Sequence, residues 1–275
     1  MFLSVNDNFF QSSLNVTNTG APQGTVLAPV LFTIYTNDCR GNFPNIPIIK
    51  YADDTAIQAL IKSETDLSNY YNEIARFVTW CKDNFLLLNV KKTKEVIFDF
   101  RKDSCHTNIE ISGQKIEKVT EYKYLGIIFD DKLSWHNQAN KVQKKINQRL
   151  YFLRKLHSFQ VDPTILKLFY KSCILSLLNF CLPAWGGNVK EVDSKKIDRC
   201  LKSAGKLLGL NIYDTTKSIF LQLCTSKLNK IILDSSHPLY IQIRKSTIEP
   251  GRLLYLKTTK TRYFNSFMPC AVRNS

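Results

Sequence analysis

Two adjacent carboxylates, Asp53 and Asp54, are the residues of this chain best suited to chemistry. Apolar residues flank them, in residues 46–49 before the pair and residues 55–61 after it. Apolar, β-prone runs on both sides of a short polar break predict a hairpin that carries both acids at its tip. Carboxylate oxygens suit Mg²⁺ and Mn²⁺, and a metal held there would stabilise a transferring phosphoryl group. Asp is also a common turn residue, so the dipeptide alone fits an ordinary turn as well.

The segments around the two acids predict the elements that would position them. A loop rich in glycine precedes a helix predicted over residues 26–37, and Thr25 is placed to cap that helix. Ser63, with Asp66 three residues later, predicts a capping box and a helix that runs to about Asn84. Strands are predicted at four later positions: residues 93–100, 108–111, 115–119 and 122–129. Helices mixed with antiparallel strands predict an α+β fold for this part of the chain.

The hydrophobic period becomes 3.6 residues from Leu133 onward, which predicts helices. An apolar stripe is formed by residues at helical spacing: Trp135, Ala139, Val142, Ile146, Leu150 and Leu153. Polar residues lie away from this stripe and form a face that can meet a phosphate backbone: Lys141, Lys144, Lys145, Gln148 and Lys155. Further helices are predicted over residues 163–181, 191–208 and 216–234, and residues 236–275 are expected to be a loosely packed basic extension.

Charge is distributed unequally along the 275 residues. Residues 1–130 hold 13 Lys and Arg against 15 Asp and Glu, whereas residues 131–275 hold 25 against 8. A nearly neutral part with paired acids, followed by a strongly basic part, indicates a metal site joined to a module that grips a polyanion. The alternative is a protein with solvated, lysine-rich faces and no anionic partner.

Several classes of protein lack their signature residues in this sequence. The eight cysteines have no pair at two-residue spacing, and no histidine begins a His-x-Asp or His-Glu-x-x-His group. Zinc-ribbon, zinc-protease and iron-oxygenase sites are therefore not predicted. The cysteines are expected to be reduced and mostly buried, with no disulfide-linked partner. The apolar runs fall short of the roughly 18 residues of a membrane-spanning helix, and the N-terminus lacks a signal-peptide pattern, so an intracellular protein with no membrane span is expected.

Four short motifs occur in a fixed order along the chain, and the second of them contains the acid pair. Residues 20–32 (GAPQGTVLAPVLF) are similar to motif B of the reverse transcriptases, and residues 51–55 (YADDT) are similar to motif C. Residues 88–94 (LNVKKTK) resemble motif D, and residues 124–126 (YLG) resemble motif E. The ordered set gives the chain a resemblance to the polymerases of jockey-related non-LTR retrotransposons, the LINE elements, over nearly its whole length.

The resemblance implies a right-hand polymerase that carries out RNA-directed DNA synthesis. Residues 1–130 would be an incomplete palm, an antiparallel sheet with packed helices. Residues 131–235 would be an all-helical basic thumb, and residues 236–275 a basic C-terminal extension. The implied partners are an RNA template, a DNA primer and, in the intact parent protein, deoxynucleoside triphosphates. The implied location is the nucleus or a cytoplasmic ribonucleoprotein.

The resemblance also implies roles for individual residues. Asp53 would ligate two Mg²⁺ or Mn²⁺ ions, with Asp54 as a supporting ligand. Lys92 would stabilise or protonate the leaving pyrophosphate, and a solvated lysine in a basic run is the competing interpretation. The substrate would meet residues of motifs B and C: Gly20, Pro22, Gln23, Gly24 and Tyr51. The primer grip would be Tyr124, Leu125 and Gly126, and the thumb would contact nucleic acid through Lys141, Lys144, Lys145 and Lys155.

One part of the family pattern is missing from this sequence. The family takes a third catalytic aspartate from motif A, upstream of motif B, and this chain begins about twenty residues before motif B. Two carboxylates alone would hold Mg²⁺ weakly, so the expectation is a polymerase fragment that is inactive or nearly inactive by itself. The alternatives are a non-catalytic RNA- or DNA-binding remnant and a structural protein that keeps the fold. Missing palm strands also predict exposed sheet edges and apolar surface.

Overall fold

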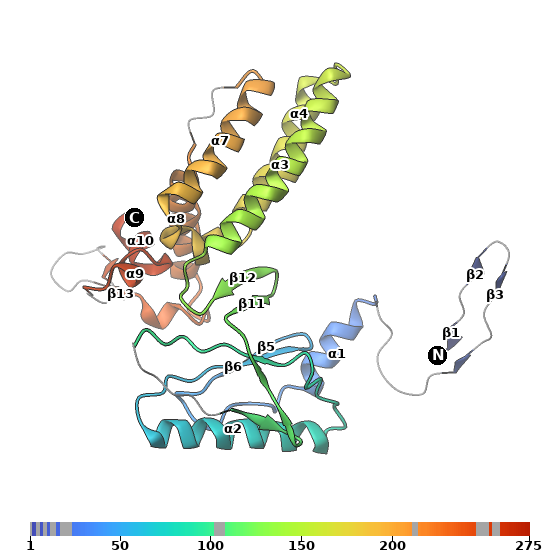
Figure 1. Cartoon of the computed structure of the whole chain (residues 1–275), viewed down its shortest axis with the longest axis vertical. Coiled ribbons are helices and arrows are strands. Elements are labelled where there is room, and N and C mark those ends of the chain that lie inside the picture. The colour runs from blue at the N-terminus through green and yellow to red at the C-terminus, as the bar shows by residue number, and fades with distance from the viewer. Residues whose placement is uncertain are drawn as a thin grey trace. The chain divides into compact units, whose positions relative to one another are not determined.

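The structure of the protein is a computed structural model. It describes residues 24–101, 108–210, 214–245, 253–254 and 259–275, together with the backbone of four short strands in the first 16 residues. Contacts divide the chain into two compact units (Figure 1). Unit 1 comprises Met1–Thr93 and His106–Glu117, and unit 2 comprises Lys94–Cys105 and Lys118–Ser275. Each unit has its own hydrophobic core.

Unit 1 combines short hairpins with two helices. Its elements in chain order are β1 (Phe2–Leu3), β2 (Asn6–Asp7), β3 (Phe10–Gln11), β4 (Asn15–Val16), α1 (Leu27–Tyr35), β5 (Ile48–Tyr51), β6 (Asp54–Ile57), α2 (Glu64–Asp83), β8 (Glu110–Ile111) and β9 (Gln114–Lys115). Strand β1 pairs with β4, β2 with β3, β5 with β6 and β8 with β9, each antiparallel. Every ladder among the described residues has two strands, so the wider sheet of a palm stays a prediction.

Helix α2 begins and ends where the sequence predicts. The amide of Asp66 donates to Ser63 Oγ at 3.2 Å, and the amide of Ser63 donates to Asp66 Oδ2 at 3.0 Å, which forms the expected capping box. The core of unit 1 consists of four buried isoleucines, one from α2 and three from the β8–β9 region: Ile74, Ile109, Ile111 and Ile116. The core that α2 helps to form is therefore small.

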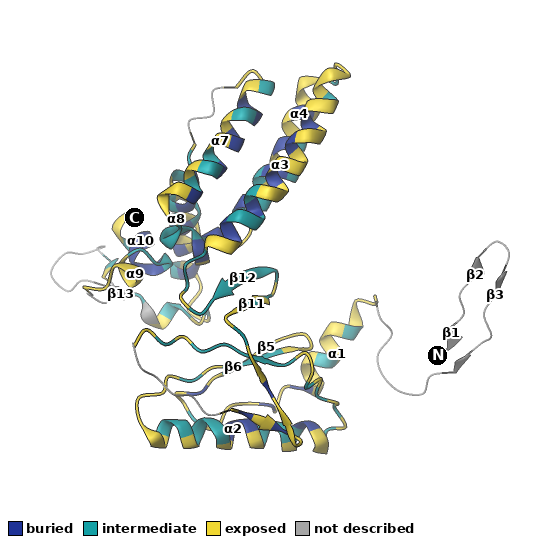
Figure 2. Ribbon diagram, in the orientation of Figure 1, coloured by how far each residue is buried: buried dark blue, intermediate teal, exposed yellow. Residues whose placement is uncertain are grey.

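Helix α1 is capped as predicted but buries none of its residues. The amide of Ala28 donates to Thr25 Oγ1 at 3.3 Å. Along the helix, Leu27 is 66% exposed and Ile34 is 67% exposed, and much of α1 is yellow in Figure 2. The apolar surface expected around the palm motifs is thus present on this helix, which follows the motif B loop.

Unit 2 is mainly helical. Its strands are β7 (Lys94–Glu95), β11 (Glu121–Tyr124), β12 (Ile127–Asp130), β13 (Arg244–Lys245) and β14 (Leu253–Leu254), and β10 (Glu117–Lys118) crosses the boundary between the units. Its larger helices are α3 (His136–Ser158), α4 (Pro163–Phe169), α7 (Glu191–Leu207) and α8 (Thr216–Leu233). Shorter helical pieces are η1 (Tyr170–Leu175), α5 (Ser176–Asn179), α6 (Leu182–Trp185), η2 (Gly186–Asn188), η3 (Tyr240–Gln242), α9 (Thr261–Phe264) and α10 (Phe267–Arg273).

The predicted helices of unit 2 are confirmed, and two predicted strands need correction. The helix predicted over 163–181 is present but contains a π-helical turn, η1. The strand predicted over 122–129 is a hairpin, because Leu125 and Gly126 both have positive φ and reverse the chain. The strand predicted over 93–100 is limited to β7, where the amide of Val119 donates to the Glu95 carbonyl at 2.9 Å.

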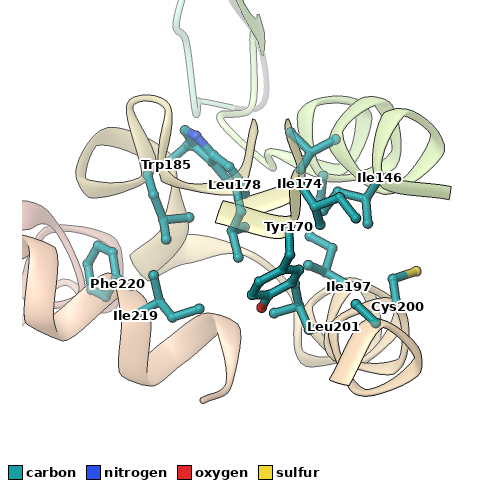
Figure 3. Packing of buried hydrophobic residues seen from close by; sticks show 14 of the residues in the cluster. Ile146, Tyr170, Ile174, Leu178, Trp185, Ile197, Cys200, Leu201, Ile219 and Phe220 are labelled. Carbon is teal, nitrogen blue, oxygen red and sulfur yellow. The ribbon is translucent and has the colours of Figure 1, made fainter. Parts of the chain in front are cut away.

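The predicted apolar stripe of α3 forms one side of the core of unit 2. Ile146 and Leu153 are 0% exposed. Figure 3 shows Ile146 next to Ile174, in one core cluster with residues from η1, α5, α6, α7 and α8: Ile174, Leu178, Trp185, Ile197, Leu201, Ile219 and Phe220. Because these side chains come from successive helices, the core joins the helices of unit 2 to the apolar side of α3.

The last helix, α10, is packed rather than loose, which corrects the expectation of a loose extension for this part of residues 236–275. Helix α10 buries Met268, Cys270 and Ala271 in the core of unit 2. A Cβ on Gly187 would lie 1.9 Å from the Asn265 carbonyl oxygen, so glycine permits this close approach. The apolar run in α10 is too short to show a helical period in the sequence, which is why the expectation missed its packing.

One helical segment of unit 2 meets the length and composition of a membrane span. The most apolar 18-residue window within Pro163–Asn188 has a mean hydropathy of 1.6, and 28% of that window is buried. A core helix of a globular protein passes the same test. The segment is broken by the π-helical turn and by Cys181, which has φ +51°, and its Leu178 and Trp185 lie in the core.

The two compact units do not follow the boundary expected near residue 130. The β11–β12 hairpin belongs to unit 2 with the helices, whereas α2 and the β8–β9 hairpin belong to unit 1. The functional division into a palm over 1–130, a thumb over 131–235 and an extension over 236–275 stays a prediction.

Candidate active site and nucleic-acid interface

The β5–β6 hairpin places the two acids at an exposed turn. Tyr51 pairs with Asp54 in the ladder, and Ala52 and Asp53 form the two-residue connection, with Ala52 at φ +52°. Asp53 therefore lies in the turn, and Asp54 is the first residue of β6. The side chains of both acids are exposed, as is that of Tyr51. The hairpin predicted from the flanking apolar runs is confirmed.

Two exposed carboxylates are a partial set of ligands for a divalent metal. Mg²⁺ is commonly bound through one or two carboxylates together with substrate phosphates and water, so Asp53 and Asp54 fit its chemistry. Within the part of the chain that the structure describes, no three His, Cys, Asp or Glu side chains form a group that could hold a metal ion. A metal at this turn would therefore need further ligands from substrate, from water or from other residues.

The base of the hairpin is anchored, whereas its tip is exposed. Lys50 Nζ donates to the Thr36 carbonyl, just after α1. Ile46, before β5, is 3% exposed, and a Cβ on Gly41 would lie 2.7 Å from its carbonyl oxygen. The chain before β5 is thus folded closely on itself, and this folding holds the strand that leads to the acids.

A buried carboxylate on α2 supports the same region, and the sequence did not reveal it. Glu73 is 0% exposed, and its Oε2 accepts a hydrogen bond from the amide of Asn42 at 3.1 Å. Arg76 forms an ion pair with Glu73 and also donates to the Arg40 carbonyl. The apolar spacing of α2 gave no reason to bury a glutamate. The signal was the oppositely charged pair three residues apart, which fits a structural ion pair.

The motif B residues are described only at the end of their loop. Gly20, Pro22 and Gln23 lie outside the described residues. Gly24 has φ +80°, a left-handed conformation that favours glycine, and it leads into the Thr25 cap of α1. The glycine is therefore required by the backbone whatever its contact with substrate.

Lys92 lies on an exposed turn that Asn89 organises. Asn89 Oδ1 accepts a hydrogen bond from the amide of Lys92 at 3.1 Å, and the Asn89 carbonyl accepts from the amide and hydroxyl of Thr93. Among the described residues, the amine of Lys92 has no hydrogen bond or ion pair. It can therefore meet an anion, as either the catalytic or the solvated interpretation requires.

The candidate primer grip in unit 2 is the tight turn of the β11–β12 hairpin. Leu125 has φ +44° and Gly126 has φ +88°, and Tyr124 pairs with Ile127 across the ladder. A Cβ on Gly126 would lie 3.3 Å from the ring of Phe180. Glycine at this position thus satisfies the positive φ and leaves room for the ring.

Lys141 supports this turn in addition to carrying charge. Its Nζ donates to the Gly126 carbonyl at 2.6 Å. Burial lowers the pKa of Lys141, and the nearby charges of Lys123 and Lys145 lower it further. A hydrogen bond of this kind ties the candidate primer grip to α3 and leaves Lys141 less available to a phosphate than a solvated lysine.

The remaining lysines of the predicted basic face are exposed on α3. Lys144, Lys145 and Lys155 lie opposite the buried stripe that contains Ile146 and Leu150. The structure therefore confirms that an apolar side and a lysine side share this helix. Their contact with nucleic acid stays a prediction.

Two polar residues that fix α3 were missed in the sequence. Gln138 is 2% exposed, and its Oε1 accepts from the amide of Ile128 in β12 at 3.0 Å. Asp193, 3% exposed at the start of α7, lies 2.7 Å from His136 Nδ1 and 2.9 Å from Lys196 Nζ. The contacts of Gln138 with Ile128 and of Asp193 with His136 join residues distant in sequence. The pair of Asp193 with Lys196 joins residues three apart, and it was the available signal in the sequence.

The cysteines in the described part of the chain are thiols, and most of them are buried. The seven cysteines in the described residues are free, and five of them are buried. Burial raises the pKa of Cys81 to about 11 and that of Cys224 to about 12, which keeps these thiols protonated near neutral pH.

Comparison with known proteins finds similarities in both parts of the chain. The model of the family described as reverse transcriptase (RNA-dependent DNA polymerase) matches residues 2–129. A second model, described as the N-terminal part of alkylated DNA repair protein alkB homolog 8, matches residues 135–176, which span α3 and α4. No solved structure matches the chain.

The similar curated proteins are polymerases of mobile elements. The chain is 30% identical over 151 residues to the RNA-directed DNA polymerase from mobile element jockey of Drosophila melanogaster, covering 51% of this chain and 16% of that protein. It is 30% identical over 189 residues to the probable RNA-directed DNA polymerase from transposon BS of the same species, covering 62% and 20%. It is 27% identical over 225 residues to the jockey polymerase of Drosophila funebris, covering 76% and 21%.

The chain thus spans about a fifth of the length of the curated relatives it matches. The matched region contains the exposed acid turn and the helix α2, and the jockey and BS polymerases extend the similarity into unit 2. Residues 2–129 are similar to the reverse transcriptase family, and the chain resembles part of the RNA-directed DNA polymerases of jockey-like mobile elements.

Proposed function

We propose that this chain supplies the metal-binding turn and the primer- and template-contacting helices of an RNA-directed DNA polymerase. The observation that carries the proposal is the exposed Asp53-Asp54 turn of β5–β6, within the segment that matches the reverse transcriptase family. The proposed substrates are a DNA primer, an RNA template and deoxynucleoside triphosphates. Two curated relatives are described as an RNA-directed DNA polymerase and a probable one, which supports this choice.

The residues of the turn and of motif D have separate tasks. Asp53 and Asp54 hold the divalent metal through their carboxylate oxygens. When bound, Mg²⁺ or Mn²⁺ supplies charge neutralisation at the triphosphate and activation of the primer hydroxyl. Lys92 Nζ meets the leaving pyrophosphate as a positive charge or a proton donor. Tyr51 and the motif B loop line the nucleotide, and the Tyr124–Gly126 turn, supported by Lys141, positions the primer.

The ligand set of the turn supports low activity of the isolated chain. The described residues give Asp53 and Asp54 no third acidic neighbour that would complete a metal-binding group. A two-metal reaction needs ligands placed within about half an ångström. We therefore propose that the chain alone extends a primer weakly or not at all.

Binding of Mn²⁺ tests the role of the acid turn without requiring activity. Asp53→Asn combined with Asp54→Asn should abolish the weak, saturable Mn²⁺ binding of the full chain, measured by electron paramagnetic resonance of free Mn²⁺. The matched control is Asp83→Asn, which removes an exposed carboxylate at the end of α2. Equal Mn²⁺ binding by the wild-type chain and the double variant would rule out the metal site.

Primer extension on an RNA template, with Mg²⁺ or Mn²⁺, tests the completeness of the site. The expected result is no extension above background by the full chain. Robust extension that Asp53→Asn abolishes would establish the metal site and overturn the proposal of low activity. Robust extension that survives Asp53→Asn would overturn the role of Asp53 as well.

A second function is nucleic-acid binding without catalysis, and the lysine side of α3 favours it. Lys144 and Lys145 are exposed on that side. Replacing both with Ala should weaken RNA binding by the full chain and reduce its dependence on salt, because fewer counterions are released. Lys227→Ala with Lys230→Ala on α8 removes the same charge from two other exposed lysines and is the matched control. Equal losses in the two double variants would show that the basic side of α3 has no special role.

A further inference from the structure

The exposed side of α3 carries aromatic rings as well as lysines. Tyr151 is 55% exposed and Phe152 is 50% exposed, near the middle of the exposed surface of a helix whose other side is fully buried. The aromatic–lysine stripe is the set of exposed residues on this side of α3: Lys144, Lys145, Gln148, Tyr151, Phe152 and Lys155. Single exposed apolar residues are common on folded proteins, but two adjacent half-exposed rings among lysines form a surface that can contact a ligand.

Helical geometry aligns the members of the stripe. Lys144, Gln148 and Tyr151 are separated by four and three residues, and Lys155 follows four residues after Tyr151, so all lie on one side of the helix. The same period puts Ile146, at 0% exposed, on the opposite side. From Lys144 to Lys155 the helix rises about 16 Å, the axial length of about five stacked nucleotides.

The two rings form a pair that can receive a planar group. The centroids of Tyr151 and Phe152 lie 5.6 Å apart at an interplanar angle of 73°. An edge-to-face pair holds the rings in a defined orientation. Since both rings keep about half of their surface exposed, each can still contact a further aromatic plane.

The charges around the rings select an anionic ligand. Residues 141–171 contain eight Lys and Arg and one carboxylate, that of Asp162. Asp162 caps α4, where its Oδ1 accepts from the amide of Thr164 at 2.7 Å. The acid is thus engaged in local structure, and the stripe itself has three cations and no carboxylate. Charge complementarity therefore favours a polyanion.

The pattern fits unpaired nucleic acid better than an apolar partner. A helix or a lipid surface would be met by a continuous apolar face, whereas Lys144, Lys145 and Lys155 surround the rings here on both sides along the helix. Proteins that bind single strands combine a basic track with aromatic side chains on which bases stack. In a duplex, the faces of the bases are occupied by their neighbours, so rings of this kind select unpaired bases.

We propose that the aromatic–lysine stripe of α3 is a binding site for single-stranded RNA or DNA, in which Tyr151 and Phe152 stack on bases and the lysines contact the phosphates. The inference rests on the proposed function in taking nucleic acid as the ligand, and adds a site for unpaired bases. It requires neither a metal nor the acid turn of unit 1.

The test compares RNA binding by variants of the full chain, measured by fluorescence anisotropy with a single-stranded RNA and with a duplex of equal length. Tyr151→Ala combined with Phe152→Ala should weaken binding to the single strand about tenfold or more and leave duplex binding within about twofold. The slope of affinity against salt should not change, because no cation is removed. Tyr151→Phe combined with Phe152→Tyr keeps both rings and should retain binding.

The control variant is Ile165→Ala with Leu168→Ala on α4. These side chains are 54% and 64% exposed, apolar and without rings, and binding should be unchanged. A single-stranded ligand with abasic positions should bind the wild-type chain more weakly but should lose little further affinity in the double alanine variant. Cooperative unfolding at the wild-type midpoint shows that each variant is folded.

Four outcomes would overturn the inference. If the double alanine variant binds the single strand as wild type does, while Lys144→Ala with Lys145→Ala still weakens binding, the stripe is wrong and the basic side of α3 stands. Equal losses for single strand and duplex would also remove the stacking site. If the double alanine variant loses binding to anionic vesicles but keeps its binding to single-stranded RNA, the rings belong to a membrane-binding surface. If the wild-type chain binds neither nucleic acid, both the stripe and the proposed function fail.

Discussion

Unit 1 and unit 2 divide chemistry and stability between them. Unit 1 has the acid turn at Asp53-Asp54, but its core has four buried isoleucines and its helix α1 buries no residue. Unit 2 has a continuous core in which Ile146, Ile174, Leu178 and Trp185 are 0% exposed. Buried apolar area is the main favourable contribution to folding. The difference teaches that motifs similar to those of a polymerase can lie in a part of the chain with a smaller core than the helices that follow.

Polar side chains show the same contrast. In unit 2, buried Gln138 and Asp193 connect separate elements to α3. In unit 1, buried Glu73 connects α2 to the loop near Asn42, while the acids of the turn are exposed. Buried polar groups with partners fix the position of an element. We therefore expect changes in unit 2 to alter stability and changes at the turn to alter function alone.

The largest expected effect is in the core of unit 2. Trp185→Ala should lower the free energy of unfolding by about 3–5 kcal/mol, because it removes a large buried ring and leaves a cavity. Denaturant unfolding of the full chain, followed by circular dichroism, measures the change. Leu27→Ala on α1, at a position 66% exposed, is the control and should cost less than about 0.5 kcal/mol. Similar costs for the two substitutions would break the contrast between the units.

The contacts of buried Asp193 with half-exposed His136 and Lys196, at the start of α7, should give an intermediate effect. Burial alone would raise the pKa of Asp193, but hydrogen bonds from His136 and Lys196 outweigh it and hold the pKa below its usual range. The stabilisation is therefore present above the unfolded pKa of about 4 and is lost as pH falls through the lower folded pKa. Asp193→Asn should cost on the order of 2–3 kcal/mol at pH 7, with a smaller cost in acid.

Unfolding midpoints between pH 2 and 7 measure this dependence. Glu191→Gln on the same helix removes an exposed carboxylate that pairs with Lys195 at 2.7 Å, and its effect should be small because water screens such a pair. An Asp193→Asn variant whose stability falls in acid as steeply as that of the wild type would show that Asp193 does not anchor α7.

The smallest effect is expected at the acid turn. Without metal, Asp53→Asn should change the free energy of unfolding by less than about 0.5 kcal/mol, because the side chain is exposed. Glu73→Gln in the same unit should cost about 1–2 kcal/mol, because it weakens the contacts with Arg76 and the Asn42 amide. Thermal unfolding in a chelator measures both. If Asp53→Asn proves the more damaging, the turn has a structural role that its exposure does not indicate.

The structure confirms several predictions for features that neighbouring residues determine. The Ser63 and Asp66 capping box, the Thr25 cap, the Asp53-Asp54 hairpin and the stripe of α3 all depend on residues within a few positions of each other. The prediction for the end of the chain failed because distant contacts decide its packing. The packing of α10 depends on Gly187, which is 78 residues from Asn265 in the numbering, and no local period reveals such a contact.

The features of the candidate site also differ in whether neighbouring or distant residues determine them. The sequence by itself determined the family motifs, the acid turn and the lysine side of α3, because each is written in short-range order and spacing. Tertiary structure alone decided that Glu73 and Asp193 are buried partners, that Lys141 holds the Gly126 carbonyl, and that Tyr151 and Phe152 keep their rings exposed. Burial and pairing depend on which distant surfaces meet, and that is fixed by packing of the whole unit rather than by any segment.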